Sequence, residues 1–215
     1  HRGEVVALLG PNGSGKTTLV KLLVNLYPAN EGSIQIDQHE IGTYDKRFLR
    51  QKIHLFPQEI YLFDASIREN ITYANPQASI DEIVTASKLA GLHDYVKTLH
   101  MGYNQKIGEF GSNLSGGQKL KIGFARLFVS NPDIIILDEA SSQLDVEAEK
   151  EILSNIKEKF ADKTVISIAH RITTLKNADR ILVMDEGKII EDGTHNELKL
   201  NNGLYATFIK TYTDM

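Results

Sequence analysis

The chain has 215 residues, of which 41% are hydrophobic and 24% charged. These values are ordinary for a globular protein of one large domain or of two lobes around a shared site. The formal net charge of -4 gives no electrostatic sign of a nucleic-acid-binding protein. The absence of cysteine excludes a disulfide scaffold and a cysteine-based metal site. No apolar run approaches the roughly 18–20 residues that span a bilayer, and no signal peptide opens the sequence.

The N-terminal part predicts strands that alternate with a helix. Val5–Leu9 is a short apolar run typical of a buried parallel strand. Leucines at helical spacing predict a helix over Lys16–Leu26. Ser33–Asp37 alternates like a strand, and Ile53–Phe56 is a strand that Pro57 ends. The sequence begins with His1 rather than Met and leads directly into the first strand, so we expect it to be a fragment of a longer protein.

The middle of the chain has a different pattern. From about residue 64 to residue 131 helical spacing dominates, most clearly in Asp81–Ala90 and Gly116–Val129. Strands and helices then alternate again, and the C-terminal residues have the pattern of an amphipathic helix. The predicted elements there are Ile134–Leu137 (strand), Val146–Phe160 (helix), Thr164–Ala169 (strand) and a hairpin of Arg180–Met184 and Lys188–Glu191.

This order predicts an α/β fold with a mostly parallel sheet and an inserted, mostly helical subdomain. We expect the α/β lobe to comprise about residues 1–63 and 132–215, and the helical lobe about residues 64–131.

A glycine-rich segment between the first strand and the first helix matches the phosphate-binding loop G-x-x-x-x-G-K-[ST]. Glycines let the backbone curl so that its N–H groups face a phosphate, and the start of the next helix adds positive potential. Lysine then supplies a cation to the outer phosphates, and threonine a hydroxyl for Mg²⁺. The residues predicted to bind ATP here are Gly10, Pro11, Asn12, Gly13, Ser14, Gly15, Lys16, Thr17 and Thr18.

Two carboxylates end the apolar strand at Ile134–Leu137. The strand delivers Asp138 to the carboxyl edge of the sheet, where ligands bind in open α/β folds, and Asp138 is a candidate Mg²⁺ ligand. Glu139 is offset by one residue and is a candidate to activate the attacking water.

The segment Leu114-Ser115-Gly116-Gly117-Gln118 opens a predicted helix. Ser115 is a good N-cap, and the two glycines expose N–H groups at the positive end of the helix. The sequence therefore predicts a second anion-binding site. On its own, this pattern is more typical of an ordinary capped helix start, because two glycines near a cap are common.

Leu114–Gln118 resembles the signature motif of ATP-binding cassette (ABC) proteins, which are P-loop NTPases with a RecA-like lobe. It lies between the phosphate loop and Asp138, in the order of that family, and the resemblance covers nearly the whole chain. Gln58 resembles the Q-loop glutamine, Ser142-Gln143-Leu144-Asp145 the D-loop, and His170 the switch histidine.

The resemblance implies that two such domains pair head to tail around two ATP molecules, the phosphate loop of one facing the signature motif of the other. Glu139 would be the general base, and His170 would contact the terminal phosphate. Gln58 would contact Mg²⁺ or the attacking water, and Asp145 would reach across the dimer.

Three segments resemble the exporter branch of the family: Phe63–Ile71, Ile107–Gly111 and Ala178–Gly193. The resemblance implies transmembrane domains that contact the chain near Gln58–Ile71 and Ile107–Gly111, at the cytoplasmic face of the cell membrane. The segment Lys119–Gly123 departs from the usual Arg-Gln-Arg-Ile-Ala, with Leu120 at a position that is usually polar. The aromatic residue that stacks on adenine in this family would lie upstream of His1.

Three other functions stay open from the sequence. They are a soluble ABC protein that acts on DNA or ribosomes, an interaction module in which ATP is structural, and a phosphotransferase with a phosphate loop. The mildly acidic charge disfavours the first, and the signature motif disfavours the last.

Overall fold

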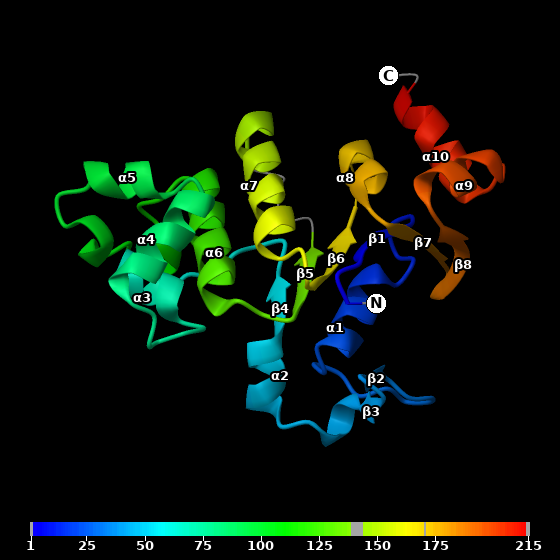
Figure 1. Cartoon of the computed structure of the whole chain (residues 1–215), viewed down its shortest axis with the longest axis horizontal. Coiled ribbons are helices and arrows are strands. Elements are labelled where there is room, and N and C mark those ends of the chain that lie inside the picture. The colour runs from blue at the N-terminus through cyan, green and yellow to red at the C-terminus, as the bar shows by residue number, and fades with distance from the viewer. Residues whose placement is uncertain (1, 139–143, 170, 214–215) are drawn as a thin grey trace. The chain divides into compact units, whose positions relative to one another are not determined.

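A computed structural model describes residues 2–138, 144–169 and 171–213 of the chain (Figure 1). The described residues form two compact units. The first comprises residues 2–55, 133–138, 162–169 and 171–213, and the second comprises residues 56–132 and 144–161. The lobe boundaries expected from the sequence stay predictions, and each unit is described below by itself.

The first unit is built on a mostly parallel sheet. In the described part of the chain this sheet has six strands, in the order β4-β5-β6-β1-β7-β8. Strand β1 pairs in parallel with β6 and β7, and β5 pairs in parallel with β6, whereas β8 is antiparallel to β7. The strands are β1 (Val5–Leu9), β4 (Ile53–Phe56), β5 (Ile134–Asp138), β6 (Thr164–Ile168), β7 (Arg180–Asp185) and β8 (Lys188–Gly193).

Apolar side chains of β1 pack on both faces of this sheet. Ala7 and Leu9 belong to a buried cluster that includes Leu175 and Tyr205. Leu8, between them, belongs to a second cluster that includes Val20. Because successive residues of a strand point to opposite faces, a strand covered on both sides needs a continuous apolar sequence. This is why the sequence of Val5–Leu9 does not alternate.

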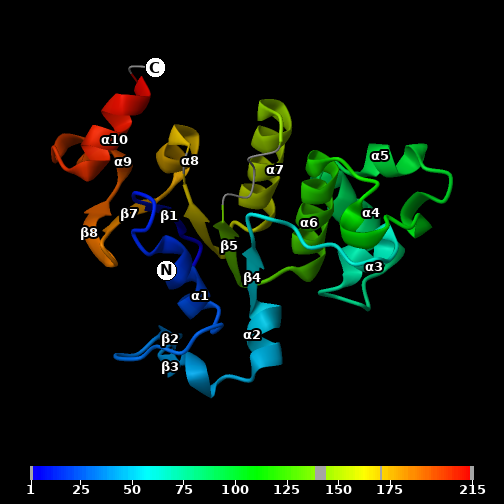
Figure 2. The same cartoon turned by 180° about the vertical axis from the view of Figure 1, so that it is seen from behind.

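Two elements of this unit are shorter than the sequence predicts. Helix α1 ends at Leu23 rather than at Leu26, and Asn25 has a left-handed φ of 53°. The strand expected over Ser33–Asp37 is reduced to β2 (Gln35–Ile36), which pairs with β3 (His39–Glu40) in a short hairpin seen below α1 in Figure 2. The other helices of the unit are a 3₁₀ helix (Ile41–Thr43), α2 (Lys46–Lys52), α8 (Ile172–Asn177), α9 (His195–Leu200) and α10 (Leu204–Thr213).

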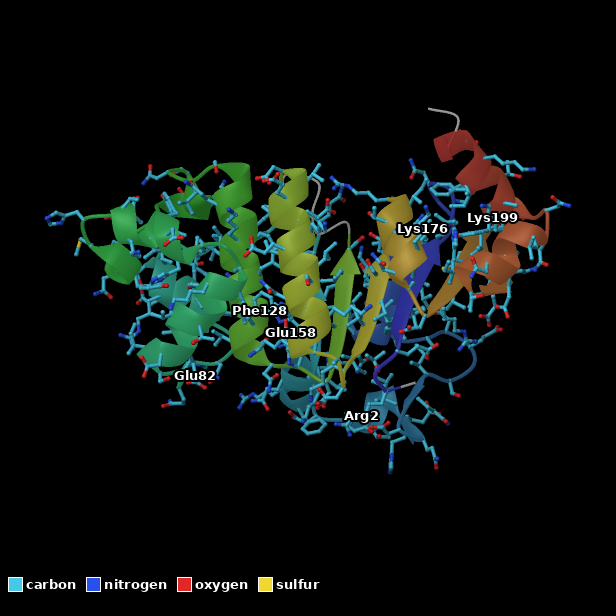
Figure 3. All side chains as sticks on the ribbon, turned by 45° about the horizontal axis from the view of Figure 1, so that its top comes forward. Arg2, Glu82, Phe128, Glu158, Lys176 and Lys199 are labelled. Carbon is cyan, nitrogen blue, oxygen red and sulfur yellow. The ribbon has the colours of Figure 1, made fainter. Side chains whose placement is uncertain are left out.

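The second unit is helical, as the spacing in the middle of the sequence predicts. Stacked aromatic rings fill part of its core: Phe56 lies 4.2 Å from Phe124, and Phe128, labelled in Figure 3, lies 5.8 Å from Phe160, between ring centroids. The α-helices are α3 (Ile67–Thr72), α4 (Ile80–Leu89), α5 (His93–Thr98), α6 (Gly116–Ser130) and α7 (Val146–Lys159), with 3₁₀ helices at Gly102–Asn104 and Glu109–Gly111.

Together the parallel sheet and the helical second unit confirm the predicted α/β fold class.

Candidate functional site

The glycine-rich loop joins the buried end of β1 to the start of α1 (Lys16–Leu23). Gly13 and Gly15 have φ values of 82° and 99°, a region that side chains with a Cβ rarely adopt. Gly15 is the N-cap of α1, and among the described residues no side chain caps this helix. The first-turn N–H groups of a helix have no acceptor inside the helix, so this helix start suits a phosphate oxygen.

The ammonium group of Lys16 lies inside the loop. Its Nζ donates hydrogen bonds to the carbonyl oxygens of Gly10 at 2.8 Å and Pro11 at 3.0 Å, and it lies 3.4 Å from Ser14 Oγ. Only 8% of Lys16 is exposed. A cation at the centre of this loop fits the predicted binding of phosphate groups.

The β7–β8 hairpin supports the loop from behind. The backbone N–H of Gly187, in the hairpin turn, donates to the carbonyl of Ser14 at 3.0 Å. A Cβ added to Gly10 would lie 2.2 Å from the carbonyl oxygen of Met184, so no other residue fits there without a shift of the backbone. The sequence predicts the hairpin, but nothing in its pattern indicates this contact with the phosphate loop.

The predicted metal ligands of the first unit offer oxygen atoms. Thr17 is exposed at the start of α1, and Asp138 is the half-exposed last residue of β5. A hydroxyl and a carboxylate are hard donors of the kind that Mg²⁺ takes when it is also bound by phosphates. The described residues contain no group of three or more His, Asp or Glu side chains that could hold a metal ion by itself.

Several residues of the predicted site cannot be placed in it from the structure. Glu139 and His170 lie outside the described residues, as do Ser142 and Gln143 of the D-loop. Gln58 is exposed in the second unit, just after β4, and its role stays a prediction. Pro11, Asn12 and Thr18 are exposed in the phosphate loop and at the start of α1.

The signature segment forms the N-terminus of α6 through a capping box. Ser115 Oγ accepts the backbone N–H of Gln118 at 3.2 Å, and the Gln118 side chain accepts the backbone N–H of Ser115 at 2.8 Å. The predicted N-cap is therefore confirmed. The N–H groups of Gly116 and Gly117 belong to the first turn, where the helix itself provides no acceptor.

Asp145 has a local structural role that the sequence analysis missed. Its side chain accepts the backbone N–H of Ala148 at 2.8 Å and is the N-cap of α7. The signal was present, because aspartate directly before an amphipathic helix is a typical N-cap. The predicted contact across a dimer stays a prediction.

The second unit also carries an aromatic surface, defined here as Tyr61, Phe63, Tyr73 and Phe110. Tyr61 lies 5.2 Å from Phe63 and 5.5 Å from Phe110, and Phe63 lies 4.5 Å from Tyr73, between ring centroids. Tyr61, Tyr73 and Phe110 are 56%, 62% and 54% exposed. Contiguous exposed aromatic groups of this kind mark interaction sites. Tyr61, Phe63 and Phe110 fall in the segments that the resemblance assigned to membrane-domain contacts.

The family model described as ABC transporter matches residues 1–142. The chain therefore belongs to the ABC transporter family, and the predicted class of enzyme, an ATPase of this family, is confirmed.

Individual relatives are proteins named as exporter components. The leukotoxin translocation ATP-binding protein LktB of Pasteurella haemolytica-like sp. (strain 5943B) is 47% identical over 206 residues, which are 95% of this chain and 29% of that protein. The leukotoxin export ATP-binding protein LtxB of Aggregatibacter actinomycetemcomitans is 46% identical over 206 residues, with the same coverage of 95% and 29%. The chain thus spans less than a third of the length of these curated relatives.

Among solved structures, a bacterial Atm1-family ABC exporter with ATP bound superposes with a TM-score of 0.94 at 39% identity. The match covers 98% of this chain and 37% of the exporter chain. Within the described residues, no helix is both long and apolar enough to cross a membrane.

Proposed function

We propose that this chain binds ATP at the phosphate loop, hydrolyses it, and powers export by a membrane transporter of which it is a part. The observation that carries the proposal is the buried Lys16 ammonium, held by the carbonyls of Gly10 and Pro11 at an N-terminus that no described side chain caps. Such an arrangement favours a multiply charged phosphate chain over a neutral ligand. The names of the relatives support export as the process that hydrolysis drives.

Thr17 and Asp138 would hold Mg²⁺, which neutralises charge on the phosphates during transfer. Gln58 stays a predicted further contact of the metal or of the attacking water. Glu139 would accept a proton from that water as it attacks the terminal phosphate, and His170 would contact the terminal phosphate.

We propose further that two copies pair head to tail, so that each ATP is bound by the phosphate loop of one copy and by the signature segment of the other. The capped start of α6 supports this role, because the Ser115–Gln118 box orders the turn that presents the Gly116 and Gly117 amides. Asp145 would approach the partner from the start of α7.

The transmembrane part of the transporter would dock on the aromatic surface. Its three exposed rings lie in the second unit, at or beside the segments Gln58–Ile71 and Ile107–Gly111. The relatives are more than three times as long as this chain, which is long enough for a transmembrane part in addition to the matched region. The chain would then lie at the cytoplasmic face of the cell membrane.

The proposal is tested by the rate of ATP hydrolysis of Lys16→Ala protein. Loss of one preorganised phosphate donor is expected to lower the rate by about 100-fold. Lys21→Ala, in the same helix, is the matched control, because the Lys21 ammonium lies over the Tyr27 ring, 5.7 Å from its centroid. Hydrolysis at the parent rate by Lys16→Ala would overturn the proposal.

The general base is tested separately by Glu139→Gln, for which the expected loss is about 100-fold or more. A labelled phosphate that appears on another molecule instead of in solution would favour the phosphotransferase.

A further inference from the structure

Arg126, in α6, binds two backbone carbonyls, one of which belongs to Tyr61 of the aromatic surface. Its Nε donates to the carbonyl of Asn70 at 2.9 Å, and its Nη1 and Nη2 donate to the carbonyl of Tyr61 at 3.2 and 3.3 Å. The planar guanidinium group can hold two acceptors in a fixed geometry, which the ammonium group of lysine cannot do. Burial lowers the pKa of Arg126 below its usual value, yet an arginine stays charged.

Asn70 extends this network into the chain that leads to α3. Asn70 is completely buried, and its Oδ1 accepts the backbone N–H of Phe63 at 2.9 Å. Its Nδ2 donates to the carbonyls of Phe63 at 3.1 Å and Ser66 at 3.0 Å. Arg126 Nη2 lies 3.5 Å from the same Oδ1. The backbone from Tyr61 to Ser66 is therefore fixed by two side chains, one of which comes from α6.

Arg126 also contacts the aromatic surface directly. Its guanidinium carbon lies 5.9 Å from the centroid of the Tyr73 ring, within the range of a cation–π interaction. The Tyr73 ring in turn packs on Phe63. Three members of the aromatic surface are thus attached to Arg126, namely Tyr61 and Phe63 through the backbone network and Tyr73 through its ring.

We propose that Arg126 is a positioning residue that links the aromatic surface to α6. A membrane partner bound to this surface would then move the surface and α6 together. The opposite end of the same helix is the signature segment. Ser115 and Arg126 are eleven positions apart, or about 16 Å along a helix axis, and α6 is unbroken between them. This inference rests on the proposed function, because it needs a partner at the aromatic surface and ATP at the signature segment.

The test measures ATP hydrolysis against ATP concentration for the full-length protein in lipid bilayers. We expect Arg126→Met to lower kcat by about tenfold, the effect of losing one charge-assisted hydrogen bond, with KM for ATP within about twofold of the parent. The phosphate loop is not part of the Arg126 network, so the KM for ATP is expected to stay near that of the parent. The kcat of Arg126→Lys is expected to lie between those of the parent and Arg126→Met, since lysine can hold one carbonyl. Arg50→Met and Arg50→Lys, at an exposed position of α2, are the matched controls.

A second measurement separates positioning from a merely structural role. Tyr73→Leu is combined with Arg126→Met, or with Arg126→Lys if the methionine protein does not fold. If Arg126 transmits docking, Tyr73→Leu lowers kcat in the parent but has little further effect once Arg126 is changed. Additive effects of the two changes, or a kcat of both Arg126 variants within about twofold of the parent, would overturn the inference.

The two proposals fail differently. If Lys16→Ala protein is inactive while both Arg126 variants match the parent, the proposed function stands and the role of Arg126 is wrong. If Lys16→Ala protein hydrolyses ATP normally, the proposed function itself is wrong.

Discussion

Two helix N-termini of this chain differ in how their first turn is satisfied. Helix α1 begins at Gly15 in a left-handed conformation, and no side chain of the described residues caps it. Helix α6 begins at Ser115 with a complete capping box. The first arrangement leaves backbone N–H groups to a ligand, and the buried Lys16 strengthens the attraction of an anion. The second is ordered by the protein itself and exposes fewer free amides.

The comparison extends to the residue that closes each box. Helices α3, α4 and α9 begin with boxes in which glutamate is the third residue: Ser66–Glu69, Ser79–Glu82 and Thr194–Glu197. Hydrogen bonds from the cap lower the pKa of each of these glutamates, so they stay charged at neutral pH. The box of α6 uses the neutral Gln118 instead. A neutral side chain is what an anion-binding helix start requires, because a carboxylate there would repel phosphate.

The largest effect is expected for Gly10→Ala, which should distort the phosphate loop that leads to the uncapped start of α1. The added Cβ would meet the Met184 carbonyl, and a backbone carbonyl cannot turn away as a side chain can. We expect ATP affinity to fall by roughly a hundredfold, or about 3 kcal/mol, measured by titration of a fluorescent ATP analogue. Gly42→Ala is the control, because an added Cβ there has no described atom within 4 Å. Parent-like affinity of folded Gly10→Ala protein would show that Gly10 does not shape the loop.

Gln118→Glu tests whether the capping box of α6 needs a neutral side chain. Glutamate can close the box in the same way, so the melting temperature should stay near that of the parent. The new charge should raise KM for ATP by roughly tenfold through repulsion of the phosphates. Steady-state kinetics at several salt concentrations check this, since the effect should weaken as salt screens the charge. An unchanged KM would argue against phosphate at this helix start.

Ser115→Ala and Ser79→Ala remove the same type of cap from two helices of one unit. Each is expected to lower the free energy of unfolding by about 1 kcal/mol, measured by chemical denaturation. Ser115→Ala should also slow ATP hydrolysis by about tenfold, as expected for a lost hydrogen bond to a charged group, whereas Ser79→Ala should not. Equal rates of ATP hydrolysis in the two variants would show that the α6 cap stabilises the fold but has no role in hydrolysis.

The smallest effect is expected at a third helix start, that of α9. His195, its first residue, has its Nδ1 2.6 Å from the Tyr205 hydroxyl. Burial lowers the pKa of His195, and Lys176 and Lys199, labelled in Figure 3, lower it further. Because the unfolded chain then binds the proton more readily, stability falls as the pH drops through the ordinary histidine value. The loss of melting temperature between pH 7.5 and 5.5 should therefore be smaller in His195→Gln than in the parent and in the exposed-site control His100→Gln.

The sequence predicted the parts of the site that are local in the chain. The strand, the phosphate loop, the start of α1 and the Ser115 cap each depend on a few consecutive residues, and all are present in the structure. Helix α2 was not predicted, although Asp45 caps it by accepting the N–H groups of Arg47 and Phe48. The short Asp37–Gln38 turn was also missed, because both residues adopt left-handed φ values without glycine.

Contacts between distant segments could not be predicted from the pattern. Arg126 contacts the backbone carbonyls of Tyr61 and Asn70, which are far away in the sequence. No sequence pattern marks either carbonyl as an acceptor for this arginine. A half-buried arginine such as Arg126 also resembles an ordinary solvated residue when only helical spacing is considered.

The contact of Gly187 with Ser14 has a consequence for synthesis of the chain. In a trans peptide the carbonyl and the following N–H point in opposite directions, so fixing the Ser14 carbonyl on the hairpin aims the Gly15 N–H toward the inside of the loop. The hairpin is made long after the loop leaves the ribosome. A nascent chain that ends before β7 carries the whole phosphate-binding motif but lacks this support, so the loop gains the contact only after the hairpin has been translated.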